Sequence, residues 1–264
     1  MSHGTPHLLP WPNAVIWVNM RLGQHFRIIA HRGASKRFEG NSWQAILFAA
    51  AKGVDGIELD LRRSSEGEFI LFHDKTLTRI DGTRNRPEEL TVSDLNQRLA
   101  EAGRSSVLLL GDLLSNYRKA VPLLFDLKLE GFPTGLVDFL EGAPCDFYLG
   151  VRTHDHLKVA ATIRPGERIL AFVPHSEAIK EFADLGAGIV RLWERWTDSA
   201  LISECHRRAL SVWIMVGQPG NPGEADEAVL ERIFAAGADG VLLNDIELAL
   251  RWRKRHYPPS DEEP

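Results

Sequence analysis

The chain has 264 residues, of which 44% are hydrophobic and 25% charged, so it is long enough to bury the core of one large domain. Its formal net charge of -5 argues against nucleic acid as the main partner, because a phosphate backbone requires a clustered positive surface. No run of apolar residues approaches the length needed to cross a bilayer, so we expect no stable membrane insertion.

We expect three segments along the chain. Residues 1–25 are predicted to be an irregular lead-in, residues 26–257 a single barrel domain, and residues 258–264 an acidic tail. No basic segment precedes the short apolar patch near the start, so the sequence predicts no secretory signal and a cytoplasmic location. A homo-oligomer is compatible with this sequence.

Short apolar runs typical of strands alternate with amphipathic stretches typical of helices from Phe26 onward. The expected strands are Phe26–His31, Val54–Leu61, Pro122–Lys128, Phe147–Val151, Arg168–Val173, Gly188–Trp193, Ser211–Val216 and Gly240–Leu243. The expected helices include Ser42–Lys52, Asp112–Ala120, Ala178–Leu185, Ser199–Ala209 and Glu224–Ala236. This alternation predicts an α/β fold, a single TIM-type (β/α)8 barrel with parallel strands.

One further run, Glu68–His73, follows the second strand after a polar turn too short for a helical crossover. We therefore predict a β-hairpin extension after the second strand. A simple hairpin would set His73 directly opposite Asp60 and return it to the carboxyl-terminal rim of the barrel.

Working residues of such barrels gather at the carboxyl ends of the strands. Glu58 and Asp60 stand two apart on one strand, so both side chains point to the same face, and Asp126 stands on the next parallel strand. Three carboxylates there would supply part of the oxygen shell of one divalent cation, Mg²⁺ or Ca²⁺.

The same strand ends carry groups suited to phosphodiester cleavage, which needs a base, an acid and cations to neutralise the phosphoryl oxygens. His31 and His73 are the candidate acid–base pair, since histidine exchanges protons near neutral pH. Arg32 and Lys128 are the candidate phosphate contacts, although Lys128 and Asp126 would also make a simple ion pair.

These residues lie in motifs that resemble the glycerophosphodiester phosphodiesterase family. The run AHRGAS…EGNS…GVDGIELDL…FILFHDKTLTR carries the resemblance, and the later pieces FDLK, SVWIMV and GADGVLLND follow in the family's order. The resemblance implies a barrel with one divalent metal held by Glu58, Asp60 and Asp126, with Arg32 and Lys128 at the phosphate. It further implies that His31 and His73 act as acid and base on a small-molecule phosphodiester. In the mechanism that the resemblance implies, a substrate hydroxyl attacks the phosphorus, and glycerol 3-phosphate and an alcohol are released.

Three positions depart from the family's usual pattern. The loop that holds Glu39 is one residue longer, the third ligand is Asp126 in place of Glu, and the strand at Trp213 lacks two polar groups. Glu39 and Trp213 are candidate substrate contacts, but Glu39 could equally bond its own loop and Trp213 could equally pack in the barrel.

Two other functions stay open. Asp126-Leu127-Lys128 is similar to the sphingomyelinase D branch and suggests a phospholipase D-like enzyme acting on lysolipids or sphingolipids. The altered loop from Glu39 to Ser42 suggests a catalytically silent barrel that binds a phosphate ligand.

Overall fold

The computed structural model describes residues 25–257. Apart from His25, the expected lead-in over residues 1–25 and the expected tail over 258–264 lie outside the described residues. Within the described part of the chain, no helix is long and apolar enough to cross a membrane.

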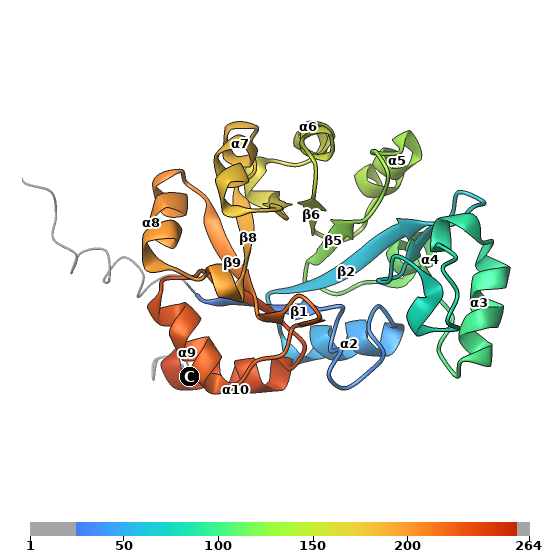
Figure 1. The fold of residues 1–264 in the computed structure, drawn as a ribbon, viewed down its shortest axis with the longest axis horizontal. Coiled ribbons are helices and arrows are strands. Elements are labelled where there is room, and N and C mark those ends of the chain that lie inside the picture. The colour runs from blue at the N-terminus through green and yellow to red at the C-terminus, as the bar shows by residue number, and fades with distance from the viewer. Residues whose placement is uncertain (1–24, 258–264) are drawn as a thin grey trace, which may run out of the picture.

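Eight parallel strands close into a barrel, as predicted (Figure 1). They are β1 (Arg27–His31), β2 (Gly56–Arg63), β5 (Leu123–Leu127), β6 (Phe147–Val151), β7 (Ile169–Ala171), β8 (Ile189–Trp193), β9 (Ser211–Met215) and β12 (Gly240–Leu243). The ring closes at β1, where Ala30 pairs with Ile57 of β2 on one side and with Leu243 of β12 on the other. Because all eight strands are parallel, their carboxyl ends meet at one mouth of the barrel.

Helices surround the strands (Figure 1). They are α2 (Trp43–Lys52), α4 (Leu110–Asn116), α5 (Thr134–Glu141), α6 (His154–Ile163), α7 (Ile179–Asp184), α8 (Ser199–Arg207), α9 (Glu227–Ala235) and α10 (Ile246–His256). Short 3-10 turns η1 (Leu77–Arg79), η2 (Pro87–Glu89), η3 (Gly166–Arg168), η4 (Ser176–Ala178) and η5 (Glu194–Trp196) and the strand pair β10 (Gly217–Gln218) and β11 (Asn221–Pro222) complete the connections. Helix α2 shows how local sequence sets a boundary. The Ser42 hydroxyl caps its first turn, and Gly53 ends it in the left-handed conformation.

The predicted hairpin is present, with one correction to its register. Strand β3 (Phe69–Leu71) runs antiparallel to β2 and then pairs with β4 (Leu108–Leu109). Leu61 pairs with Leu71, and the Phe72 amide donates to the Asp60 carbonyl at 3.0 Å, so Phe72 rather than His73 lies opposite Asp60. The reason is that the turn closes between Ser64 and Glu68, one residue tighter than a His73–Asp60 pairing requires. His73 follows directly after the ladder.

The hairpin supports a small subdomain beside the barrel. Helix α3 (Val92–Glu101) packs there over a separate apolar cluster. That cluster consists of Ile70, Phe72, Leu77, Leu90, Leu95 and Leu99. Because Phe72 is anchored in this cluster, the backbone at His73 is held at the barrel mouth.

Candidate active site at the barrel mouth

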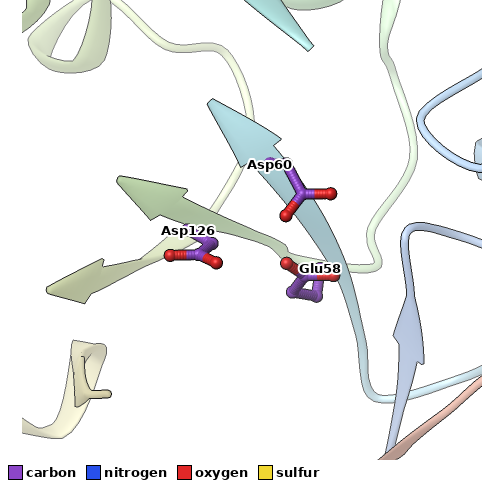
Figure 2. Close-up of side chains that lie close together, drawn as sticks. All are labelled: Glu58, Asp60 and Asp126. Atoms are coloured by element: carbon purple, nitrogen blue, oxygen red, sulfur yellow. The ribbon is translucent and has the colours of Figure 1, made fainter. Parts of the chain in front are cut away.

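Three buried carboxylates converge at the carboxyl ends of β2 and β5, as the sequence predicted (Figure 2). Asp60 pairs in register with Asp126 on the neighbouring strand, and Glu58 precedes Asp60 by two residues, on the same face. One ligand atom from each of Glu58, Asp60 and Asp126 lies within 4.8 Å of the other two. All three residues are at most 3% exposed.

The electrostatics of this cluster fit a divalent cation. Burial, together with the charges of Asp60 and Asp126, raises the pKa of Glu58 well above its ordinary value. Burial alone would raise the pKa of Asp60 as well, but Lys128, His73 and Arg32 outweigh it and hold that pKa well below the usual range. A hard cation with oxygen ligands would relieve the repulsion that now favours protonation of Glu58.

Two cationic side chains contact the carboxylates directly. Lys128 Nζ lies 2.6 Å from Asp60 Oδ1 and 3.9 Å from Asp126 Oδ2. Arg152, just after β6, binds Asp126 with both arms of its guanidinium group, Nε to Oδ1 at 2.8 Å and Nη2 to Oδ2 at 2.5 Å. Lys128 therefore sits between the two predicted aspartate ligands, and Arg152 covers one of them.

His31 presents a single ring nitrogen toward the carboxylates. Its Nδ1 lies 2.7 Å from Oδ1 of Asn244, whose own Nδ2 donates to Pro222 O and Glu224 Oε1, so the amide orientation is fixed. Because that Oδ1 only accepts, His31 Nδ1 carries the hydrogen and Nε2 keeps its lone pair. Nε2 lies 4.0 Å from Glu58 Oε2. Burial, reinforced by the Arg32 charge, lowers the pKa of His31 to about 3, so this imidazole is neutral at ordinary pH.

His73 forms a second imidazole–carboxylate arrangement on the hairpin side. Its Nδ1 lies 2.7 Å from Asp74 Oδ1, and this hydrogen bond lowers the pKa of Asp74. Its backbone carbonyl accepts from Lys128 Nζ and from Arg62 Nη2, each at 3.3 Å. The His73 side chain is 31% exposed, whereas that of His31 is 5% exposed. The two histidines thus differ in hydration.

Arg32 occupies a strained backbone position beside the cluster. Its φ of 56° lies in the left-handed region, and its amide donates to Glu58 Oε2 at 2.9 Å. Its Nε lies 3.2 Å from His31 Nε2 and 3.5 Å from Asp60 Oδ2. The conformation places both the amide and the guanidinium group of Arg32 against the acidic cluster.

Two of the predicted substrate contacts lie away from the carboxylates. The Glu39 carboxylate accepts hydrogen bonds from Arg104 Nε at 2.6 Å and from the Ser105 amide at 2.9 Å. It lines a small cavity of about 90 Å³ together with Arg32 and His73. Trp213 is 1% exposed, packs edge-on against Tyr148, and lines a cavity formed by the amino ends of the strands. The structure does not bring Trp213 together with the other predicted site residues, because its ring points to the opposite mouth.

The structure adds four residues to which sequence reasoning gave no role. Asn41 and Asn244 hold Asp60 and His31, and Arg152 and Arg191 bring further positive charge. A signal was available for all four: Arg152 follows the end of an expected strand, where working residues gather, and a cation at Arg191 interrupts the apolar run of β8. Asn41 and Asn244 lie in the motifs EGNS and GADGVLLND, but only the folded barrel shows their partners.

Comparisons with known proteins find matches in sequence and in fold. A model described as the glycerophosphoryl diester phosphodiesterase family matches residues 31–132. An uncharacterized protein of Bacillus subtilis is 33% identical over 153 residues, which cover 53% of this chain and 63% of that protein. A glycerophosphodiester phosphodiesterase of Caldanaerobacter subterraneus is 33% identical over 70 residues, 26% of this chain and 29% of that protein. The aligned segments therefore span less than two thirds of these relatives.

A solved structure shares the fold. An Oleispira antarctica phosphodiesterase, in complex with the product sn-glycerol-3-phosphate, superposes with a TM-score of 0.67 at 19% identity, covering 87% of this chain and 96% of that one.

Proposed function

We propose that this chain is a member of the glycerophosphoryl diester phosphodiesterase family and hydrolyses glycerophosphodiesters to sn-glycerol 3-phosphate and an alcohol, because a model of that family matches residues 31–132. The observation that carries the proposal is the buried group Glu58, Asp60 and Asp126, with His31 and His73 both close enough to act on the Asp60 charge. The product bound to the Oleispira antarctica phosphodiesterase supports the choice of glycerol 3-phosphate. The alternative of a silent binding barrel loses its motivation, since the longer loop still delivers Asn41 to Asp60.

Glu58, Asp60 and Asp126 would hold one divalent cation, Mg²⁺ or Ca²⁺. Such an ion supplies charge neutralisation at the phosphoryl oxygens and orients the diester. Arg32 and Lys128 would contact the same oxygens from the β1 and β5 sides, and the planar guanidinium group of Arg32 is suited to two oxygens at once.

The two histidines are suited to opposite roles. His31 is neutral, and its unprotonated Nε2 accepts from Arg32 Nε at 3.2 Å; with Arg32 turned to the phosphate, this nitrogen would accept the proton of the attacking hydroxyl. His73 holds Nδ1–H against Asp74, and with a second proton on Nε2 it would protonate the departing alkoxide. In this assignment the buried ring of His31 is the base and the partly exposed ring of His73 is the acid.

Turnover of a diester panel tests the proposal. The purified chain, stripped with EDTA and reloaded with Mg²⁺ or Ca²⁺, is incubated with glycerophosphocholine, glycerophosphoethanolamine and lysophosphatidylcholine. We expect metal-dependent release of glycerol 3-phosphate from the two deacylated diesters. A cyclic phosphate from the lysolipid, seen by ³¹P NMR, with no reaction of the deacylated diesters would instead establish the phospholipase D-like alternative.

Histidine variants test the assignment of roles. His31→Gln and His73→Gln should each lower kcat by about 10²- to 10⁴-fold. His25→Gln is the matched control, because that imidazole pairs with Asp55 near the amino ends of the strands. Unchanged turnover in either site variant would refute the acid–base assignment.

A further inference from the structure

Arg191 is a buried cation inside an apolar strand. It is 4% exposed, and among the described residues its Nε and Nη1 have no hydrogen-bond partner. Its guanidinium carbon lies 4.3 Å from the ring centre of Trp193 and 5.2 Å from that of Phe172. Burial, together with the nearby Arg152 charge, lowers the pKa of Arg191 to about 9. A buried cation with free donors is costly unless an anion meets it.

Arg152 stands beside it at the mouth. Its guanidinium carbon lies 4.7 Å from the same Phe172 ring, and 40% of its side chain is exposed. The ring reaches inward because Gly150 leaves room for it: a Cβ at Gly150 would lie 2.4 Å from Phe172. The Phe172 ring is therefore contacted by the partly exposed guanidinium group of Arg152 and the buried one of Arg191, on the β6–β8 side of the acidic cluster.

The cationic side chains named at the barrel mouth, together with a divalent ion, would carry more positive charge than the three carboxylates and one phosphodiester group neutralise. Arg32, Lys128, Arg152 and Arg191 are four cations facing three carboxylates. A divalent ion on those carboxylates would add two positive charges, whereas a phosphodiester brings one negative charge. Arg32 and Lys128 would serve that phosphate and Arg152 is paired with Asp126, so of these four cations the one without a carboxylate partner among the described residues is Arg191.

We propose that Arg152 and Arg191 form a second anion subsite, which receives a phosphate or carboxylate group on the alcohol arm of the diester. The inference rests on the proposed function and specifies its substrate class. Arginine suits the role because its planar fork grips phosphate and carboxylate oxygens in pairs. Arg191 supplies unused donors at the base of the subsite, and Arg152, whose Nε and Nη2 bind Asp126, would add its Nη1 from the solvent side.

Matched substrate pairs test the subsite. Glycerophosphoinositol 4-phosphate differs from glycerophosphoinositol by one phosphate, and glycerophosphoserine differs from glycerophosphoethanolamine by one carboxylate. For the metal-loaded wild type we expect kcat/KM to favour the charged member of at least one pair by about 10- to 100-fold, as for a hydrogen bond to a charged group. The pair that shows the preference identifies the anion.

Variants locate the preference. Arg191→Met and Arg152→Gln should each remove most of the ratio within the favoured pair. Arg168→Met is the control, since that arginine also stacks on an aromatic ring, Tyr148, but at the opposite mouth. Equal turnover within both pairs, or a ratio that survives in both site variants, would overturn the subsite.

A binding measurement separates this inference from the proposed function. Calorimetry of the EDTA-treated chain compares, within each substrate pair, the member that carries the extra anion with the member that lacks it. We expect tighter binding of the member with the extra anion in at least one pair, lost in Arg191→Met and Arg152→Gln. If no diester is hydrolysed but this difference is found, the proposed function fails and the subsite stands. If diesters are hydrolysed without substrate or binding preference, the subsite alone fails.

Discussion

Asn41 offers the sharpest test of how the acidic cluster is held. This residue is 7% exposed, its Nδ2 donates to Asp60 Oδ2 at 2.9 Å, and its Oδ1 accepts from the Asp60 amide at 3.1 Å. Its φ of 63° lies in the left-handed region, which asparagine tolerates better than alanine does. Asn41→Gly removes the two side-chain bonds without backbone strain, whereas Asn41→Ala removes them and adds strain.

The magnitude follows from these contacts. A hydrogen bond to a charged group contributes about 1.5–3 kcal/mol and a neutral one about 1 kcal/mol, so losing both costs about 2.5–4 kcal/mol of unfolding free energy. Relief of backbone strain in the glycine variant returns part of that loss. We expect Asn41→Gly to lose about 2–3 kcal/mol and Asn41→Ala about 1 kcal/mol more.

Urea unfolding of the metal-free chain, followed by circular dichroism, measures both losses. Asn116→Ala serves as the control, because that exposed amide bonds only the Asp112 carbonyl and its loss should stay within about 0.5 kcal/mol. An Asn41→Gly variant as stable as the wild type, or an alanine variant more stable than the glycine variant, would refute the reasoning.

Three further outcomes are expected. Lys128→Met should bind Mg²⁺ several-fold more tightly in calorimetry, because a cation no longer lies 2.6 Å from a ligand carboxylate; weaker binding would contradict this. Gly150→Ala should lose about 1–3 kcal/mol of stability, because the added methyl group would collide with Phe172. Gly111→Ala is the control and should not lose stability, because a Cβ there would lie 3.5 Å from the nearest atom, on Phe139. Equal stabilities of the two variants would contradict the close packing at Gly150. Burial raises the pKa of Cys205 to about 11, so the thiol of the unfolded chain ionises at a lower pH than the thiol of the folded chain. The free energy of unfolding should therefore decline from about pH 9 upward, by at most about 1.4 kcal/mol per pH unit. Cys205→Ala should flatten that decline, and identical pH curves for the variant and the wild type would show that the pKa shift is absent.

The alternation of apolar runs and amphipathic stretches was sufficient to predict the barrel, because parallel strands that are buried on both faces have nearly continuous apolar sequences, such as Leu123–Leu127. It also predicted the gathering of Glu58, Asp60 and Asp126, since spacing along a strand and parallel register are both regular. Prediction failed by one residue at the hairpin, where the closure of the turn at Ser64 and Glu68 sets the register.

The contacts of the polar residues that support the site were out of reach of local patterns. Asn244 contacts His31 across the barrel seam, so this contact depends on ring closure. Arg152 reaches Asp126 from the neighbouring strand β6, and the direction of its side chain decides that contact. Trp213 was predicted to contact the substrate, but it lies at the other mouth of the barrel from the carboxylates. The side chain of a residue inside the barrel can point toward either mouth, and the sequence does not say which.

The bond between His31 and Asn244 joins positions 213 residues apart, at the first and last strands. Every predicted metal ligand and both imidazoles lie between His31 and Asp126, yet the tautomer of His31 depends on Asn244, which follows the last barrel strand. A chain cut before β12 would therefore keep every predicted reactive side chain and lose the group that fixes the hydrogen on His31 Nδ1.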